Sequence, residues 1–233
     1  MVLKDDELAT IVLAIRYGRV IFRNIRQFIY FLLSGNVSEI LIITLAALVN
    51  APLPLLPLQI LYLNLIGDVF PALALGVGEG DESVMRRPPR DPKEPILTRG
   101  HWLGIGGYSL VICAAVLGGF ALALTRFAMN PAEAVTVSFL SLSLARLWHV
   151  FNMRSAGSKL WSNEITRNPF IWLALLLCLG LLGIALAIPG LRAILGLTLP
   201  SATGWWLVLA VSLLPLVVGQ AVKLARGGRA AGH

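Results

Sequence analysis

The stretch PLQILYLNLIGDVFPALALG, residues 57–76, decides the fold of this chain. Nearly all of its residues are apolar, and about 20 such residues cross the hydrocarbon core of a bilayer as a helix. Its one charged residue, Asp68, therefore lies in a segment assigned to the membrane. Pro71 has no N–H, so the carbonyl of Gly67 loses its helical hydrogen-bond partner. We predict a membrane helix with irregular backbone beside a carboxylate; the alternative is a simple proline kink with Asp68 protonated.

A second carboxylate, Glu39, lies in the apolar stretch Phe28–Val49, whereas the other ten of the twelve acidic residues fall in polar segments. Asn36 precedes Glu39 by three residues, so the two side chains share one face of a helix. Asn64 precedes Asp68 by four residues, with the same consequence. Acids and amides that converge within a membrane indicate a cation site, because their oxygens are ligands for Ca²⁺ and similar hard cations.

The composition is that of an integral membrane protein, with 57% hydrophobic residues, 13% charged residues and a mean hydropathy of +0.80. The net charge of +7 does not indicate nucleic-acid binding, because the basic residues are spread through loops without an aromatic platform. We predict an all-α fold: a polytopic membrane helix bundle of six transmembrane helices with an amino-terminal cytoplasmic stalk helix. The predicted spans are Phe28–Val49, Leu55–Val77, Trp102–Leu124, Val135–Phe151, Phe170–Ile188 and Trp205–Val222.

The distribution of Lys and Arg predicts the orientation in the membrane. Sixteen of them lie on one side, in the segments 4–26, 86–99, 154–167 and 223–229, against only Arg126 and Arg192 on the other. By the positive-inside rule both termini are expected in the cytoplasm. Tryptophans near span ends are expected to anchor the helices at the membrane interfaces: Trp102, Trp161, Trp205 and Trp206.

The first span continues backwards into a stretch, Leu8–Gln27, with apolar residues at helical spacing and arginines between them. This pattern predicts a helical stalk that extends the first membrane helix into the cytoplasm. A basic amphipathic helix lying on the membrane surface is the alternative.

Two residues of the fourth span have basic side chains. Arg146 needs a counter-charge at membrane depth, and Glu39 or Asp68 could supply it; alternatively its long side chain reaches the cytoplasmic interface beside Arg154. His149 is expected to be an interfacial hydrogen-bonding residue rather than a ligand.

Several long motifs, in this order and spacing, resemble the carboxy-terminal membrane half of a P-type cation-transporting ATPase of the calcium-pump-like branch. MVLKDDELATIV resembles the last segment of the phosphorylation domain, and GRVIFRNIRQFIYFLLSGNVSEI resembles the stalk and fifth membrane helix. PLQILYLNLIGDVFPALALG resembles the sixth helix, and VMRRPPRDPKEPIL the cytoplasmic loop that follows it. The resemblance extends from the first residue to about Lys223, with the last two spans carried mainly by hydropathy.

The resemblance implies a domain organisation. Residues 1–27 would be the end of the phosphorylation domain and the stalk, 28–77 a helical hairpin carrying the ion site, and 78–101 a cytoplasmic loop that docks on the phosphorylation domain. Residues 102–223 would be a four-helix carboxy-terminal membrane domain and 224–233 a cytoplasmic tail. The expected location is the inner membrane of a bacterium.

The resemblance also implies metal ligands and partners. The residues at ion-ligating positions are Asn36, Glu39, Asn64 and Asp68, and the transported cation would be Ca²⁺ or a similar ion. The DKTGT phosphorylation motif, the actuator domain and the nucleotide-binding domain are absent from this sequence. ATP and Mg²⁺ would therefore act only through an amino-terminal half of the pump, and we expect no catalytic residue here and no ATP hydrolysis by this chain alone.

Two departures from the family pattern bear on the ion. Gly67 stands where calcium pumps usually carry threonine, and Arg146 stands where the family tends to place Glu or Gln. We hypothesise that Arg146 is a fixed internal cation that occupies one of two family sites, leaving a single ion site near Asn64 and Asp68.

Two other functions are possible for such a chain. A non-catalytic, pump-derived membrane protein that binds or scaffolds another membrane protein is the main alternative. A secondary transporter or channel would show inverted repeats or a pore-lining pattern, and the sequence has neither.

Overall fold

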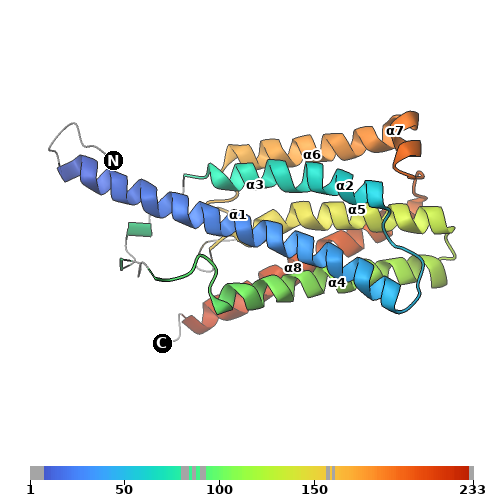
Figure 1. The fold of residues 1–233 in the computed structure, drawn as a ribbon, viewed down its shortest axis with the longest axis horizontal. Helices are drawn as coiled ribbons and strands as arrows, with labels where there is room; N and C mark the ends of the chain where they lie inside the picture. The colour runs from blue at the N-terminus through green and yellow to red at the C-terminus, as the bar shows by residue number, and fades with distance from the viewer. Residues whose placement is uncertain are drawn as a thin grey trace.

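The computed structural model describes residues 8–79, 84–85, 88–89, 93–155, 158 and 161–230. Its helices run side by side along one long axis, and the amino-terminal part of the first helix projects beyond the others (Figure 1). We call the end from which it projects the stalk end. The described chain also finishes at the stalk end, because the last helix returns there (Figure 1). The side of the membrane on which this end lies stays a prediction, as do the expected domain boundaries.

Six helices are long and apolar enough to cross a membrane. This confirms the predicted all-α bundle of six spans, and the described residues contain no strand. The elements are α1 (Leu8–Leu48), α2 (Pro57–Leu63), η1 (Asn64–Asp68), α3 (Val69–Gly76), α4 (Arg99–Thr125), α5 (Pro131–His149), η3 (Val150–Met153), α6 (Pro169–Ala187), α7 (Pro189–Ile194) and α8 (Ala202–Ala230). The second span consists of α2, η1 and α3 in succession.

The stalk and the first span form one continuous helix, α1, of 41 residues. At 1.5 Å per residue such a helix is about 60 Å long, twice the hydrocarbon thickness of a bilayer. Its amino-terminal part therefore extends beyond the membrane as an axial continuation of the span. It does not turn to lie across the ends of the neighbouring helices (Figure 1).

The irregular backbone predicted in the second span is a π-helical turn, η1, which covers Asn64 to Asp68. It interrupts the α-helical pattern just before Pro71, which cannot donate a backbone hydrogen bond. The Cys178 thiol of α6 donates to the carbonyl of Ile66 within this turn at 3.1 Å. A backbone carbonyl in a wide turn thus has a side-chain partner from a neighbouring helix, as expected where irregular backbone lies at membrane depth.

Helix α5 is the centre of the bundle. In an apolar stretch of 18 residues within this span, 89% of the residues are buried. The corresponding stretches of the other five spans are 33% to 44% buried. Helices α4 and α8 pack on it, and α1 packs on α4, so that α5 is surrounded by protein on most sides (Figure 1). A side chain on α5 is therefore directed into protein rather than lipid, which decides the environment of Arg146.

Asparagine side chains join the stalk end of α3 to its neighbours. Asn24 of α1 donates to the carbonyls of Gly76 and Gly78 at 3.1 and 2.6 Å. Asn168, which precedes α6, donates to the carbonyl of Ala74 at 2.9 Å. These bonds satisfy carbonyls at the carboxy-terminal end of α3 that have no helical partner, and they fix the position of the second span between α1 and α6.

Candidate functional site

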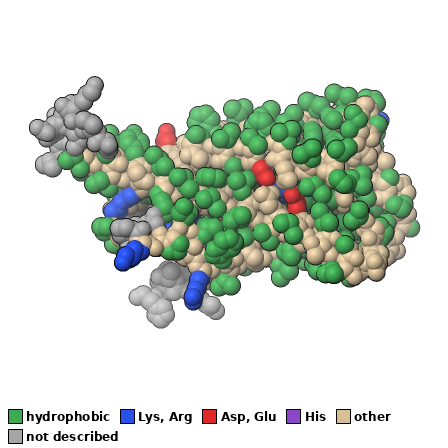
Figure 2. All heavy atoms as spheres, in the orientation of Figure 1, with side chains coloured by type: hydrophobic (Ala, Val, Ile, Leu, Met, Phe, Trp, Pro, Cys, Tyr) green, Lys and Arg blue, Asp and Glu red, His purple; other side chains and the backbone are tan. Residues whose placement is uncertain are grey.

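The intramembrane acidic and amide side chains converge about midway along the bundle. Figure 2 shows acidic side chains there beside a basic one, within a surface that is otherwise mainly hydrophobic. Asn36 and Glu39 come from α1, and Asn64 and Asp68 come from the π-turn η1. The structure thus brings together all four residues that the sequence singled out, from two neighbouring spans.

The guanidinium of Arg146, from α5, lies at the centre of this group. Its Nη1 forms an ion pair with Glu39 Oε1, and its Nη2 forms an ion pair with Asp68 Oδ1. Nη2 also donates to Asn36 Oδ1 at 3.1 Å, and Nη1 to Asn64 Oδ1 at 3.4 Å. We call these five residues the Arg146 cluster.

Arg146 does not reach the cytoplasmic interface, so the alternative of a side chain extended beside Arg154 is wrong. The residue is 1% exposed, and its Nε has no hydrogen-bond partner among the described residues. The position of α5 at the centre of the bundle explains the difference, because burial leaves two carboxylates as the available partners for the charge. Arg154, beside which it was expected, is itself buried and donates to Gln220 Oε1 at 2.9 Å.

A glycine makes room for the guanidinium. A β-carbon at Gly35 would lie 2.7 Å from Arg146 Nε and 2.8 Å from Nη2, closer than real β-carbon contacts. Gly35 is on α1 next to Asn36, so the same helical turn supplies both a ligand oxygen and the space for the arginine. This role of Gly35 was not predicted from the sequence, where its signal is a small residue next to the predicted ligands.

Burial decides the electrostatics of the cluster. Glu39 is 5% exposed, and the side chain of Asp68 is 15% exposed. Two ionised carboxylates and one guanidinium carry a net charge of −1, so the cluster has an excess of negative charge when both acids are ionised. Each ion pair is needed to offset the loss of water around its partners. A cation that bound here would compete with the guanidinium for the same oxygens.

The ligand set is modest in number. Among the described residues, no three His, Cys, Asp or Glu side chains lie close enough to hold a metal ion together. The cluster offers two carboxylates and two amide oxygens, which are hard ligands of the kind that Ca²⁺ takes, although Ca²⁺ prefers six to eight oxygens. A Ca²⁺ ion held here would need further oxygens from water, backbone or other segments.

His149 lies one turn after Arg146, and its environment differs from the interfacial one expected. The residue is 1% exposed, and neither ring nitrogen has a hydrogen-bond partner among the described residues. Its ring packs against Phe31, with centroids 6.1 Å apart, and against Tyr108, with centroids 4.6 Å apart. The prediction of an interfacial hydrogen-bonding histidine is therefore wrong, because the end of α5 is covered by α1 and α4.

Ion pairs at the stalk end hold α1 against the loops. Arg23 Nη2 pairs with Glu164 Oε1 at 2.5 Å, and Arg26 Nη2 pairs with Glu94 Oε1 at 3.2 Å. Burial alone would raise the pKa of Glu164, but hydrogen bonds from its own backbone and from Ser155, together with the charge of Arg23, lower it below its ordinary value. Glu164 is therefore a stable anion at neutral pH. The centre of the predicted docking loop, residues 80–83, 86–87 and 90–92, lies outside the described residues.

Comparisons with known proteins add to this geometry. Residues 52–225 match the family described as "Cation transporting ATPase, C-terminus". The chain is 39% identical over 215 residues to a calcium-transporting ATPase of Bacillus subtilis, which covers 92% of this chain and 24% of that protein. It is 35% identical over 240 residues to calcium-transporting ATPase 1 of Bacillus cereus, covering 97% and 27%. A third relative, calcium-transporting ATPase 1 of Lactococcus lactis, is 33% identical over 232 residues. The chain spans about a quarter of the length of these relatives.

Proposed function

This chain belongs to the P-type cation-transporting ATPases as their carboxy-terminal membrane part, and we propose that its Arg146 cluster binds the cation that the pump moves. The proposed cargo is Ca²⁺, because three relatives are named calcium-transporting ATPases and because the four side-chain oxygen donors are hard ligands. The chain is a multi-pass membrane protein. Its stalk end faces the cytoplasm in this proposal, which also places it in the inner membrane of a bacterium.

One observation carries the proposal. Glu39 and Asp68 lie within apolar spans of different helices, yet their carboxylates meet at a single guanidinium. Ionisable side chains at membrane depth are costly, and they are kept where they serve an ion path or a binding site. One carboxylate is enough to neutralise one arginine. This site has two, on separate helices, and each has an amide on its own helical face.

Arg146 acts in this proposal as the internal counter-charge of the site. With the guanidinium in place, a divalent cation would face a cluster whose net charge is only −1, and the arginine would repel it. Binding of Ca²⁺ therefore requires the guanidinium to leave at least one carboxylate. Arg146 contacts both Glu39 and Asp68, so an ion site near Asp68 opens only when that contact breaks. With Arg146 holding part of the ligand set, the proposal is a single Ca²⁺ site.

The energy for transport would come from outside this chain. The partner is an amino-terminal half with actuator, nucleotide-binding and phosphorylation domains, through which ATP and Mg²⁺ would act. The stalk would transmit their movement to the Arg146 cluster, because α1 runs unbroken from Leu8 to the turn that carries Asn36 and Glu39. The loop at residues 78–101 is the proposed docking segment for the phosphorylation domain.

A second candidate is supported by the same cluster. Because Arg146 already satisfies both carboxylates, the bundle can be stable without any bound cation. A pump-derived scaffold that binds another membrane protein would have this property. The two candidates differ in whether a cation changes the state of the cluster.

The test is phosphoenzyme formation in a complete pump. The chain would be joined to, or co-expressed with, a matching amino-terminal half, and phosphoenzyme would be measured with Ca²⁺, Mn²⁺, Mg²⁺, Na⁺ or K⁺ added in turn. We expect stimulation by Ca²⁺ in the wild type and at least a tenfold loss of apparent Ca²⁺ affinity in Asp68→Asn. Little change is expected in Glu133→Gln, which alters an acid outside the Arg146 cluster and the docking loop and keeps an oxygen that can accept from the Ser201 N–H. Phosphoenzyme that forms equally with and without every cation would support the scaffold and contradict the pump.

A further inference from the structure

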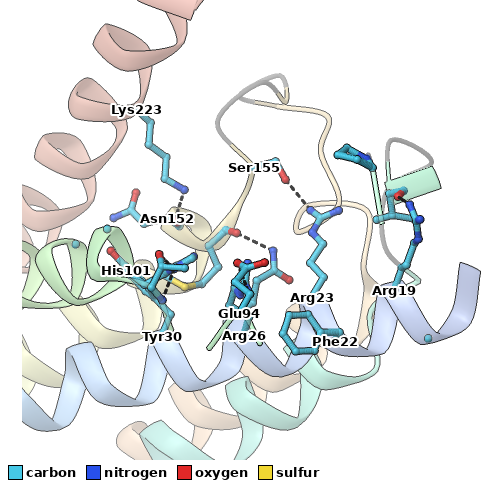
Figure 3. Close-up of a pocket in the computed structure, with 18 of the residues that line it drawn as sticks. Arg19, Phe22, Arg23, Arg26, Tyr30, Glu94, His101, Asn152, Ser155 and Lys223 are labelled. Atoms are coloured by element: carbon cyan, nitrogen blue, oxygen red, sulfur yellow. Dashed lines mark hydrogen bonds and ion pairs between the residues drawn. The ribbon is translucent and has the colours of Figure 1, made fainter. Parts of the chain in front are cut away.

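A cavity at the stalk end lies apart from the Arg146 cluster. Its volume is about 1140 Å³, and its walls come from α1, α4, the η3 region, α8 and five residues of the loop before α4: Val84, Pro88, Pro89, Glu94 and Thr98. Figure 3 shows Arg23 rising from α1 toward Ser155, and Lys223 extending from α8 toward Asn152 on another wall. Basic side chains from helices far apart in the sequence thus border one space.

The charge of the lining is mainly positive. The described lining residues include four basic side chains, those of Arg19, Arg23, Arg26 and Lys223, against the one carboxylate of Glu94. Lys223 Nζ donates to the backbone carbonyls of Asn152 and Arg154, which carry no net charge to offset its own. The ion pairs of Arg23 with Glu164 and of Arg26 with Glu94 offset part of this charge, and the positive charge that remains would attract an anion into the cavity.

Two guanidinium nitrogens of the lining residues lack acceptors. Arg23 Nη1 and Arg26 Nε are buried without a hydrogen-bond partner among the described residues. Other atoms of the two guanidiniums have partners. Arg23 Nη2 donates to Glu164 Oε1 and Ser155 Oγ, and the guanidinium carbon of Arg26 lies 4.9 Å from the centroid of the Phe22 ring. A buried N–H of a charged group without an acceptor is costly. These two nitrogens are themselves buried, so a phosphate in the cavity would contact the exposed parts of the two side chains, which are 12% and 24% exposed.

The cavity lies where the chain passes from polar to apolar surroundings. Arg26 is the last basic residue of α1 before the apolar stretch Phe28–Val49, and Trp102, 54% exposed, stands beside the lining residue His101 at the start of α4. Tryptophans at this kind of position mark the headgroup level of a bilayer. Deeper lining residues are aromatic or apolar: Tyr30, Tyr108 and Met153.

From these observations we propose that the cavity binds the phosphate headgroup of an anionic phospholipid. Arg26 and Lys223 hold the phosphate, the other arginines add positive charge, and the aromatic and apolar wall receives the glycerol and the first part of an acyl chain. A free phosphate ion would leave most of the cavity unfilled. Pockets of about 300–1,000 Å³ hold drug-sized ligands, which are much larger than phosphate. This inference depends on membrane insertion and is independent of ion transport by the Arg146 cluster.

The test uses the whole chain in detergent, equilibrated with equal amounts of phosphatidylglycerol and phosphatidylcholine and examined by native mass spectrometry. We expect the wild type to retain phosphatidylglycerol at least tenfold in preference. Arg26→Gln combined with Lys223→Gln should reduce that retention about tenfold, whereas Arg192→Gln, at the opposite end of the bundle, should not. Equal retention of the two lipids by the wild type would overturn the proposal.

A second variant blocks the cavity without removing a charge or an existing contact. Gly18 lines the cavity, and a β-carbon there would meet no atom within 4 Å, so Gly18→Leu should fold normally and occupy the headgroup space. Gly106→Leu is the matched control, because Gly106 also has open space but lies on the exposed surface of α4. We expect Gly18→Leu alone to lose phosphatidylglycerol about tenfold. Retention equal to that of Gly106→Leu would contradict the assignment.

A competition experiment separates lipid from soluble anion. An excess of inorganic phosphate is added to the wild type carrying phosphatidylglycerol. If the cavity is a lipid site, the lipid stays bound, because its apolar part also contributes to binding. If phosphate displaces the lipid, the site recognises a soluble anion and the lipid assignment is wrong.

Discussion

The guanidinium of Arg146 packs directly on the backbone of Gly35, where a β-carbon would come within 2.7 Å of its Nε. Helix α1 therefore has no side chain at the point where α5 places the guanidinium of Arg146. The ion pairs of Arg146 with Glu39 and Asp68 depend on that gap, because they fix the guanidinium between α1 and η1.

Gly35→Ala should destabilise the bundle even though alanine is the better helix former. We expect a loss of about 1–3 kcal/mol from overpacking against Arg146, measured as a lower melting temperature in detergent. Gly180→Ala is the control, because a β-carbon at Gly180 meets nothing within 4 Å, and it should raise stability by about 0.5–1 kcal/mol. Equal effects of the two substitutions would show that the guanidinium is not held against Gly35.

Arg146→Gln should destabilise the isolated chain by about 3–5 kcal/mol at neutral pH, because two carboxylates then lie buried without their counter-charge. Adding Glu39→Gln and Asp68→Asn to this variant should restore much of the loss, since the unpaired charges are then gone. Arg167→Gln, which alters an exposed arginine that binds Ser162 Oγ, serves as the control. Melting temperatures of the four proteins check this, and a triple variant no better than Arg146→Gln would contradict it.

Glu164→Gln should weaken the attachment of the stalk, with a pH dependence whose sign follows from the lowered pKa of Glu164. A carboxyl group whose pKa is lower in the folded chain contributes stability above its unfolded value of about 4.5, and it loses that contribution as the pH falls through the folded value. We expect the variant to be about 1 kcal/mol less stable at pH 7.

The measurement for Glu164 is the difference in melting temperature between wild type and variant as the pH is lowered. That difference should be constant at neutral pH and shrink below about pH 4.5. Glu79→Gln controls for the loss of an exposed acid. A difference that grows as the pH falls would have the opposite sign and would refute the assigned role of the Arg23–Glu164 pair.

Cys178→Val should cost about 1–3 kcal/mol, because it leaves the Ile66 carbonyl of the π-turn without its donor at membrane depth. Cys178→Ser keeps a donor at that position and should be closer to the wild type. Thermal unfolding in detergent compares the two. If valine is tolerated as well as serine, the thiol does not stabilise the turn.

Hydropathy was enough to predict the six spans, because crossing a bilayer requires length and apolarity that a sequence displays directly. The stalk was predicted from the helical spacing of apolar residues in Leu8–Gln27, with a helix on the membrane surface as the alternative. The convergence of Glu39 with Asp68 was expected as well. Helical spacing put each acid on one face with its amide, and adjacent spans are usually neighbours in space. Pro71 likewise indicated the irregular turn that the structure shows as η1.

The positions of Arg146 and His149 could not be predicted in the same way. Both lie near the end of a span, where a long or polar side chain can either reach the interface or turn inward. The outcome depends on which helix occupies the centre of the bundle, and hydropathy carries no such information. In the structure α5 is that helix, so both side chains are buried. Gly35 was missed for the same reason, since its role appears only once Arg146 is known to face it.

Equilibrium binding of radioactive Ca²⁺ to a complete pump that carries this chain tests most directly whether the Arg146 cluster holds the transported ion. We expect at most one ion per wild-type pump, none in Asp68→Asn at the same Ca²⁺ concentration, and tighter or additional binding in Arg146→Gln, where the competing guanidinium is gone. Ca²⁺ binding that is the same in all three proteins would place the ion elsewhere and contradict this account of the cluster.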